Sequence, residues 1–105
     1  MAKTSYAIAL GSNRSHPRHG APEAVIGAAL AMLAELGTVV RSARIRRYPP
    51  LGTADRIFAN GAAILATRLE PDALLAALKH IERKFGRRPG RRWGPRVLDL
   101  DIILW

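Results

Sequence analysis

The sequence has no cysteine and no long hydrophobic run, and each absence excludes a class of protein. Without cysteine, the chain can form neither disulfide bonds nor metal sites built from thiolates. No apolar stretch approaches the ~20 residues that a membrane-spanning helix needs. The first residues, Met1 to Ser5, also lack the apolar segment of a signal peptide. We therefore expect a cytoplasmic protein that has no membrane partner.

Acidic residues are scarce as well, with 8 Asp and Glu side chains against 17 Lys and Arg side chains. The formal net charge of +9 predicts an anionic partner but does not identify it. A generally basic composition would explain the charge equally well. The 105 residues allow one small domain, residues 1–105, and a hydrophobic share of 49% is enough for an ordinary core. We expect this domain to be a monomer.

Hydrophobic patterns predict six elements in the order β-α-β-β-α-β. The helices carry apolar stripes at helical spacing, which are Ile26, Leu30 and Leu33 in the first and Leu74, Leu78, Ile81 and Phe85 in the second. The predicted ranges are a strand over Tyr6–Leu10, a helix from Pro22 to a stop at Gly37, a strand over Val39–Arg47 without clean alternation, a strand over Phe58–Leu69 with a bulge at Gly61, a helix from Pro71 to a stop at Gly86, and a strand over Val97–Leu104. This order predicts an α+β fold of the ferredoxin-like βαββαβ type, with a four-stranded antiparallel sheet and two helices packed on one face.

Two carboxylates occur in the apolar last strand. Asp99 and Asp101 alternate with Leu98, Leu100 and Ile102, so both carboxylates would point to one face, about 7 Å apart at ~3.3 Å per residue. Two anions on one face repel each other unless a cation lies between them. Mg²⁺ is often held by one or two carboxylates plus substrate phosphates, so the pair is a candidate metal site. A pair of solvated residues on an edge strand is the simpler interpretation of this motif alone.

A cluster of basic residues precedes the last strand, and Pro89 and Gly90 interrupt it, which predicts a loop instead of a helix. Its guanidinium groups could neutralise a polyphosphate, and such a loop could close over a bound nucleotide. A solvated charged surface and a nucleic-acid site are the alternatives. Aromatic residues do not interleave with the arginines as they do in RNA-binding motifs, so RNA binding ranks last. The basic residues are Arg83, Lys84, Arg87, Arg88, Arg91, Arg92 and Arg96.

A rigid segment, Pro49-Pro50-Leu51-Gly52, separates the second predicted strand from the third. With Phe58 and Asn60 it could form a wall that binds a flat heterocycle. Phe58 would stack on the ring, and the Asn60 amide would pair with the ring edge through a donor and an acceptor. A turn followed by a core aromatic residue is the favoured interpretation of these residues alone. Gly11-Ser12-Asn13, at the end of the first strand, is likewise explained by a plain turn.

Several segments of the chain resemble 6-hydroxymethyl-7,8-dihydropterin pyrophosphokinase, a family of folate biosynthesis. The most specific segment is 92–103, Arg-Trp-Gly-Pro-Arg-Val-Leu-Asp-Leu-Asp-Ile-Ile, which is similar to the family signature almost residue for residue. The remaining similar segments are 9–13 at the end of the first strand, 48–52 and 58–60 in the pterin-binding elements, and 81–87 at the end of the second helix. The resemblance covers essentially the whole chain in order.

The resemblance implies transfer of the pyrophosphoryl group of ATP to the hydroxymethyl group of the pterin, with release of AMP. The partners would then be small molecules, and Asp99 and Asp101 would hold two Mg²⁺ ions. Arg87, Arg92 and Arg96 are implied as catalytic residues. The residues implied for ATP binding are Leu75, Glu82, Arg87, Arg92, Trp93, Arg96 and Ile102. The residues implied for pterin binding are Tyr48, Pro50, Leu51, Phe58 and Asn60.

The chain departs from the family pattern in two places. The loop between Gly86 and Trp93 is shorter, which leaves open whether Arg88 or Arg91 is the second loop arginine. Family members also continue beyond the last strand with a Pro-His element, further arginines and an aromatic residue, so we expect this chain to lack the family's C-terminal segment. Two other interpretations therefore stay open: a truncated, non-catalytic module that binds nucleotide or pterin, and a basic RNA-binding domain.

Overall fold

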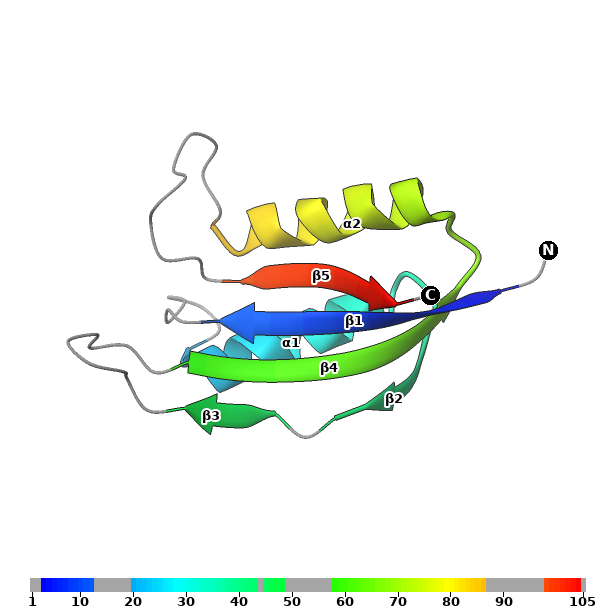
Figure 1. Cartoon of the computed structure of the whole chain (residues 1–105). Helices are drawn as coiled ribbons and strands as arrows, with labels where there is room; N and C mark the ends of the chain where they lie inside the picture. Colours follow the sequence, from blue (N-terminus) through cyan, green and yellow to red (C-terminus); the bar gives the residue numbers. More distant parts are fainter. Residues whose placement is uncertain (1–2, 13–19, 44, 49–57, 87–97, 105) are drawn as a thin grey trace.

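The computed structural model describes residues 3–12, 20–43, 45–48, 58–86 and 98–104, which form one antiparallel sheet and two helices (Figure 1). The elements are β1 (Thr4–Ser12), α1 (Pro22–Leu33), β2 (Thr38–Ser42), β3 (Arg46–Tyr48), β4 (Phe58–Thr67), α2 (Pro71–Lys84) and β5 (Asp99–Leu104). The strands lie in the order β2-β4-β1-β5, and β3 also pairs with β4. Neither helix in these ranges is long and apolar enough to cross a membrane.

The strands β2 and β3 follow the same edge of β4, one after the other. Thr38–Ser42 lie opposite 63–66 of β4, and Arg46–Tyr48 lie opposite 58–60. Between them, the Ala43 amide donates a hydrogen bond to the Ala62 carbonyl at 2.8 Å. They therefore act as one interrupted strand. Counted in this way, the described sheet has four strands in the order β5, β1, β4 and β2–β3. This arrangement confirms the predicted fold class, whereas the single strand predicted over Val39–Arg47 is divided in two.

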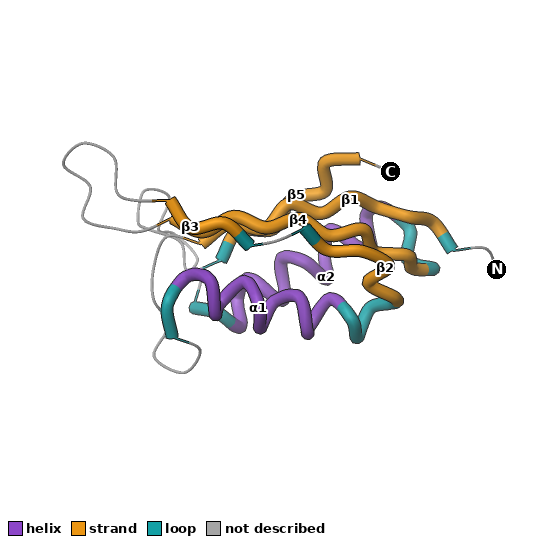
Figure 2. The backbone as a smooth tube through the Cα atoms, turned by 90° about the horizontal axis from the view of Figure 1, so that it is seen from below, coloured by secondary structure: helices purple, strands orange, loops and turns teal. Residues whose placement is uncertain are grey.

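Both helices lie on one face of the sheet, as Figure 2 shows from below the view of Figure 1. The alternation within β1 accounts for this arrangement. Tyr6, Ile8 and Leu10 are buried toward the helices, whereas Ala7 and Ala9 on the other face are only partly buried. Large apolar side chains at every second position drive this face of the sheet against the helices, because burying them removes apolar surface from water.

Helix α1 begins with Pro22 in its first turn, a position where the missing amide is not needed. It ends at Leu33, so the predicted extension to Gly37 is wrong. Gly37 has a different function in the fold, because a Cβ atom there would collide with the carbonyl oxygen of Ala66 in β4. The glycine permits close approach of the chain to β4 and does not cap the helix. The Thr67 hydroxyl fixes the same turn by donating to the Leu36 carbonyl at 2.7 Å.

Helix α2 matches its prediction closely. The predicted stripe of Leu74, Leu78, Ile81 and Phe85 is buried, and Phe85 follows the last helical residue. Gly86 has a φ of 102°, a left-handed conformation that is costly for residues with a Cβ atom. The sequence therefore predicted both the buried face and the end of this helix.

The core fills the space between the helices and the sheet, and Gly61 shows how closely α1 approaches β4. Gly61 pairs with Leu10 without a register shift, so the predicted bulge at Gly61 is wrong. A Cβ atom on Gly61 would lie 3.0 Å from Cγ2 of Ile26, so the glycine lets α1 pack tightly on β4.

The buried Tyr6 side chain also has a polar partner. Its hydroxyl donates a hydrogen bond to the Leu69 carbonyl at 2.9 Å. Burial, and to a smaller extent the carboxylates of Glu70 and Asp72, raise the pKa of Tyr6.

Candidate functional site

The two aspartates of β5 lie on the face of the sheet that faces away from both helices. Leu98 and Leu100 are fully buried in the core, while Asp99 is partly exposed and Asp101 is exposed. This alternation places both carboxylates on the same face, as the sequence pattern predicts. Since no helix in the described ranges covers this face, a ligand can approach both carboxylates from solvent.

Asn60 and Asp99 lie in one row across three strands. Gly11 of β1 pairs with Asn60 of β4 on one side and with Asp99 of β5 on the other. Adjacent strands are about 4.8 Å apart, so the Cα atoms of Asn60 and Asp99 are about 10 Å apart. A Cβ atom on Gly11 would lie 3.5 Å from Oδ1 of Asn60, which shows that the Asn60 side chain extends over Gly11. The register therefore brings a predicted pterin residue and a predicted metal ligand together.

Small residues continue the surface beside this row along the strands. In the next row on the same face, Ala9 pairs with Ala62 of β4 and with Asp101 of β5. Glycine and alanine side chains leave the backbone of this face accessible, and a planar ring can lie against such a surface. The two rows place carboxylates at the β5 side of this surface and the Asn60 amide at the β4 side.

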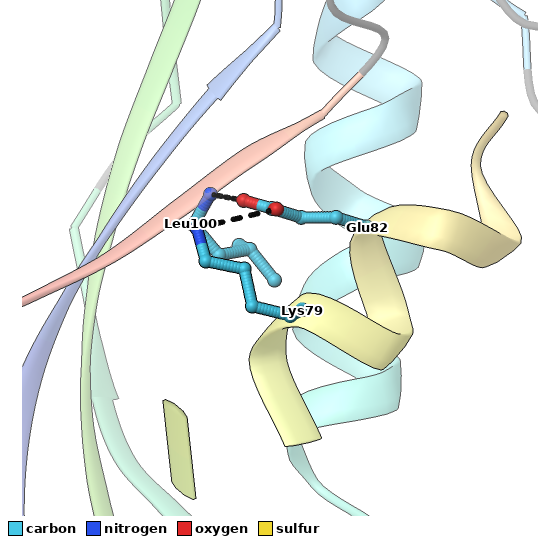
Figure 3. Close-up of polar contacts among 3 residues, drawn as sticks. All are labelled: Lys79, Glu82 and Leu100. Atoms are coloured by element: carbon cyan, nitrogen blue, oxygen red, sulfur yellow. Dashed lines mark hydrogen bonds and ion pairs between the residues drawn. The ribbon is translucent and has the colours of Figure 1, made fainter. Parts of the chain in front are cut away.

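The backbone between the two aspartates is held from α2. The Leu100 amide donates a hydrogen bond of 2.7 Å to Oε2 of Glu82, whose side chain is completely buried (Figure 3). The other carboxylate oxygen of Glu82, Oε1, lies 3.4 Å from Nζ of Lys79, one turn earlier on α2. The segment that carries the candidate metal ligands is thereby tied to the end of the helix.

The donor set fits a hard divalent cation that shares its coordination with a ligand. Asp99 and Asp101 offer carboxylate oxygens, which Mg²⁺ prefers. Among the residues that the structure describes, no group of three or more His, Cys, Asp or Glu side chains is placed to hold a metal ion. Two carboxylates alone leave most coordination positions to water and substrate oxygens, which is how Mg²⁺ is bound at many phosphate-transfer sites.

Three residues predicted for the ATP side, Leu75, Glu82 and Ile102, lie on α2 and β5, which run side by side (Figure 1). Leu75 is exposed on α2, and Ile102 is partly buried against the core from β5. Glu82, by contrast, is in the interior. On the pterin side, Tyr48 of β3 pairs with Phe58 of β4, two residues along β4 from Asn60.

The other predicted residues lie outside the described part of the chain. They are Pro50, Leu51, Arg87, Arg92, Trp93 and Arg96, together with Arg88 and Arg91, between which the sequence did not decide.

Two features of the site were not predicted from the sequence. Gly11 was interpreted as part of a turn, but it is within β1, which continues to Ser12, and lies between Asn60 and Asp99. The hydrogen bond from Leu100 to Glu82 joins residues 18 positions apart, and no local pattern indicates it. A shallow depression of about 260 Å³ also lies next to Ile64 and Arg41, but none of the predicted site residues lines it.

Comparison with known proteins identifies a family that matches this chain. Residues 7–105 match the model of the family described as 7,8-dihydro-6-hydroxymethylpterin-pyrophosphokinase (HPPK). The 2-amino-4-hydroxy-6-hydroxymethyldihydropteridine pyrophosphokinase of Pseudomonas aeruginosa is 46% identical over 99 residues, which cover 93% of this chain and 59% of that protein. The enzyme of the same name from Haemophilus influenzae is 39% identical over 105 residues, covering 97% of this chain and 62% of that protein.

The match extends to a larger protein of plants. The mitochondrial folate synthesis bifunctional protein of Pisum sativum is 40% identical over 100 residues, covering 93% of this chain and 18% of that protein. The chain thus spans about three fifths of the length of the bacterial relatives named above. Since the family model matches nearly every residue, the chain belongs to the 7,8-dihydro-6-hydroxymethylpterin-pyrophosphokinase family.

Proposed function

We propose that this chain transfers pyrophosphate from ATP to 6-hydroxymethyl-7,8-dihydropterin, giving AMP and the pterin diphosphate for folate biosynthesis. The observation that carries the proposal is the row formed by Asn60, Gly11 and Asp99. In this row the Asn60 amide can pair with the edge of a heterocycle, and the Asp99 carboxylate can bind a metal ion that also binds phosphate. Both groups lie on a face open to solvent. Membership in a family described as a pterin pyrophosphokinase supports the assignment of these two groups to pterin and ATP.

Each group has a defined task in this reaction. Asp99 and Asp101 would hold two Mg²⁺ ions, which neutralise and orient the triphosphate when bound. The pterin hydroxyl oxygen would form a bond to the β-phosphorus while the bond from that phosphorus to the α,β-bridging oxygen breaks. AMP leaves with the bridging oxygen, and the hydroxyl proton passes to water. Because such transfers depend on positioning and charge neutralisation, the reaction does not require a covalent bond between the protein and the transferred group.

The remaining predicted residues complete two binding sites in this proposal. The ATP site comprises Leu75, Ile102, Arg87, Arg92, Trp93 and Arg96, with Arg87, Arg92 and Arg96 as catalytic residues that contact the phosphates. The pterin site comprises the backbone of Tyr48, Pro50 and Leu51 together with Phe58 and Asn60. We also propose that the protein acts as a monomer in the cytoplasm.

The direct test is to incubate the purified chain with ATP, Mg²⁺ and 6-hydroxymethyl-7,8-dihydropterin and to measure AMP. We expect AMP formation that requires all three components. The double variant Asp99→Ala/Asp101→Ala should lose both AMP formation and Mg²⁺-dependent nucleotide binding, because no metal ligand remains on β5. Unchanged nucleotide binding in this variant would contradict the metal assignment.

Calorimetry on the same samples separates the alternatives. Binding of nucleotide or pterin without AMP release would support a non-catalytic binding module. Binding of RNA that weakens steeply with salt and is unaffected by the aspartate substitutions would support an RNA-binding domain.

A further inference from the structure

Among the residues that the structure describes, Glu82 carries a charged side chain that is completely buried in the core. We infer that Glu82 is a positioning residue, whose buried carboxylate fixes the Leu100 amide and thereby sets the spacing and direction of Asp99 and Asp101. The inference rests on the proposed metal-binding function of the two aspartates. It assigns Glu82 an indirect effect on ATP, through β5, in place of the direct contact that the family resemblance implies.

The position of the Leu100 amide shows why this contact matters. Strand β5 is at the end of the strand order and pairs with β1 on one side only, among the described strands. The Leu100 amide donates to Glu82 at 2.7 Å and therefore points to the outer edge of β5, away from β1. Glu82 thus supplies, at this one position, the acceptor that a further strand would supply.

Packing alone does not explain why a glutamate occupies the buried position 82. Other positions on the buried stripe of α2 carry Leu74, Leu78 and Ile81, so packing requires only apolar side chains there. A carboxylate with no exposed surface costs desolvation energy, which only hydrogen bonds and a cation can offset. Oε2 accepts from Leu100, and Oε1 lies 3.4 Å from Lys79, so both oxygens have a partner. A charged acceptor also makes a shorter and stronger bond to an amide than a neutral one does.

The consequence for the metal follows from the order of residues on β5. Asp99 and Asp101 flank Leu100, so the plane of the peptide that Glu82 holds helps to determine where both carboxylates point. Metal sites require their ligands within about 0.5 Å of the productive geometry. Partners that orient metal ligands typically change metal affinity by about 10–100-fold when they are removed. Glu82 is such a partner, and it acts through the backbone.

The test compares two neutral substitutions of almost equal shape. Glu82→Gln retains an oxygen acceptor for the Leu100 amide, whereas Glu82→Met removes it. We would titrate Mn²⁺ in the presence of α,β-methylene-ATP, whose α,β bridge resists cleavage, and follow water-proton relaxation. The expected dissociation constant for Mn²⁺ stays within about threefold of the parent in Glu82→Gln and rises by about tenfold or more in Glu82→Met. Since both variants lose the charge, a difference between them reports the hydrogen bond.

Two further variants separate this effect from general damage. Lys79→Met removes the ion pair and leaves the Leu100 hydrogen bond, so the Mn²⁺ dissociation constant should change less than threefold. Glu82→Asp keeps the charge but shortens the side chain by one methylene group, so it should weaken Mn²⁺ binding about as much as Glu82→Met. Glu82→Asp therefore also serves if Glu82→Met does not fold. Circular dichroism at the temperature of the titration establishes which variants are folded.

A spectroscopic signal follows the same bond directly. In the parent chain, the amide proton of Leu100 should resonate far downfield and exchange slowly, because its hydrogen bond to a carboxylate is short. The resonance should move upfield in Glu82→Met and stay close to its position in Glu82→Gln.

The outcomes distinguish this inference from the proposed function. Equal Mn²⁺ affinity in folded Glu82→Gln and Glu82→Met would overturn the positioning role, and so would a loss in Lys79→Met as large as that in Glu82→Met. Both results leave the proposed function intact, provided that Asp99→Asn/Asp101→Asn abolishes Mn²⁺ binding. Mn²⁺ binding that survives in this double variant would overturn the metal site itself, and the positioning role with it.

Discussion

The two faces of the sheet are built from the same strands but differ in almost every property. On the face toward the helices, β1 presents Tyr6, Ile8 and Leu10, all buried. On the other face the same strand presents Ala7 and Ala9, which are only partly buried. The contrast shows that the two faces have different roles. One face buries apolar side chains that stabilise the fold, and the other has room for polar groups and ligands.

Strand β5 shows this difference within consecutive residues. Leu98, just before the strand, and Leu100 bury their side chains in the core, while Asp99 and Asp101 project to the opposite face. A shift of one residue in the pairing with β1 would exchange the two sets, burying the carboxylates. The burial of these two leucines therefore fixes the face on which the carboxylates lie.

The largest expected effect comes from truncating neighbouring residues of β4 that point to opposite faces. Leu65 is completely buried in the core, so Leu65→Ala should lower the free energy of unfolding by about 2–5 kcal/mol. Ile64 is only partly buried on the other face, and Ile64→Ala should cost about 1 kcal/mol or less. Urea unfolding measures both values. Equal losses would mean that the second face contributes to the core as well.

The contrast between the faces also explains how much of the fold could be predicted. The apolar run over Tyr6–Leu10 predicted strand β1, and the helical spacing of apolar residues predicted the buried stripe of α2. The interruption of the strand β2–β3 was not predicted, because a register shift between Val39 and Arg41 removes the alternation and β4 determines its pairing. Gly37 and Gly61 were misinterpreted for a related reason. Gly37 lacks a Cβ atom because the chain passes close to Ala66 there, and Gly61 lacks one because Ile26 packs against it. Both contacts join residues that are distant in the sequence.

The candidate site was predictable where it depends on one strand and not where it depends on several. The shared face of Asp99 and Asp101 follows from alternation alone. The row that joins Asn60 to Asp99 through Gly11 depends on two strand registers, and neither register can be read from a single segment.

An intermediate effect is expected from adding a methyl group to a glycine on each face. Gly61 lies toward α1, and the new Cβ atom of Gly61→Ala would be 3.0 Å from Ile26, a buried and stiff side chain. We expect a loss of about 1–3 kcal/mol from this overpacking. Gly11 pairs with Asn60 on the other face, where a Cβ atom would meet Oδ1 at an ordinary 3.5 Å.

The matched variant Gly11→Ala should therefore change the free energy of unfolding by less than about 0.5 kcal/mol. It should instead weaken pterin binding, because the methyl group would lie between Asn60 and Asp99. Thermal unfolding and pterin titration of both variants check these expectations. A stability loss in Gly11→Ala comparable to that in Gly61→Ala would show that the face opposite the helices is also tightly packed.

The smallest effect on stability is expected at the site itself. Asp101 is exposed, so Asp101→Asn should change the free energy of unfolding by less than about 0.5 kcal/mol without divalent metal. Mg²⁺ and ATP at 100 times their dissociation constant should stabilise the parent chain by about 2.7 kcal/mol, and this gain should disappear in Asp101→Asn. Glu35→Gln, which removes an exposed acid in the turn after α1, should retain the gain. Thermal unfolding with and without ligand measures all three proteins. If Asp101→Asn destabilised the unliganded chain by several kcal/mol, the aspartate would belong to the fold, and the two faces would not be separate in function.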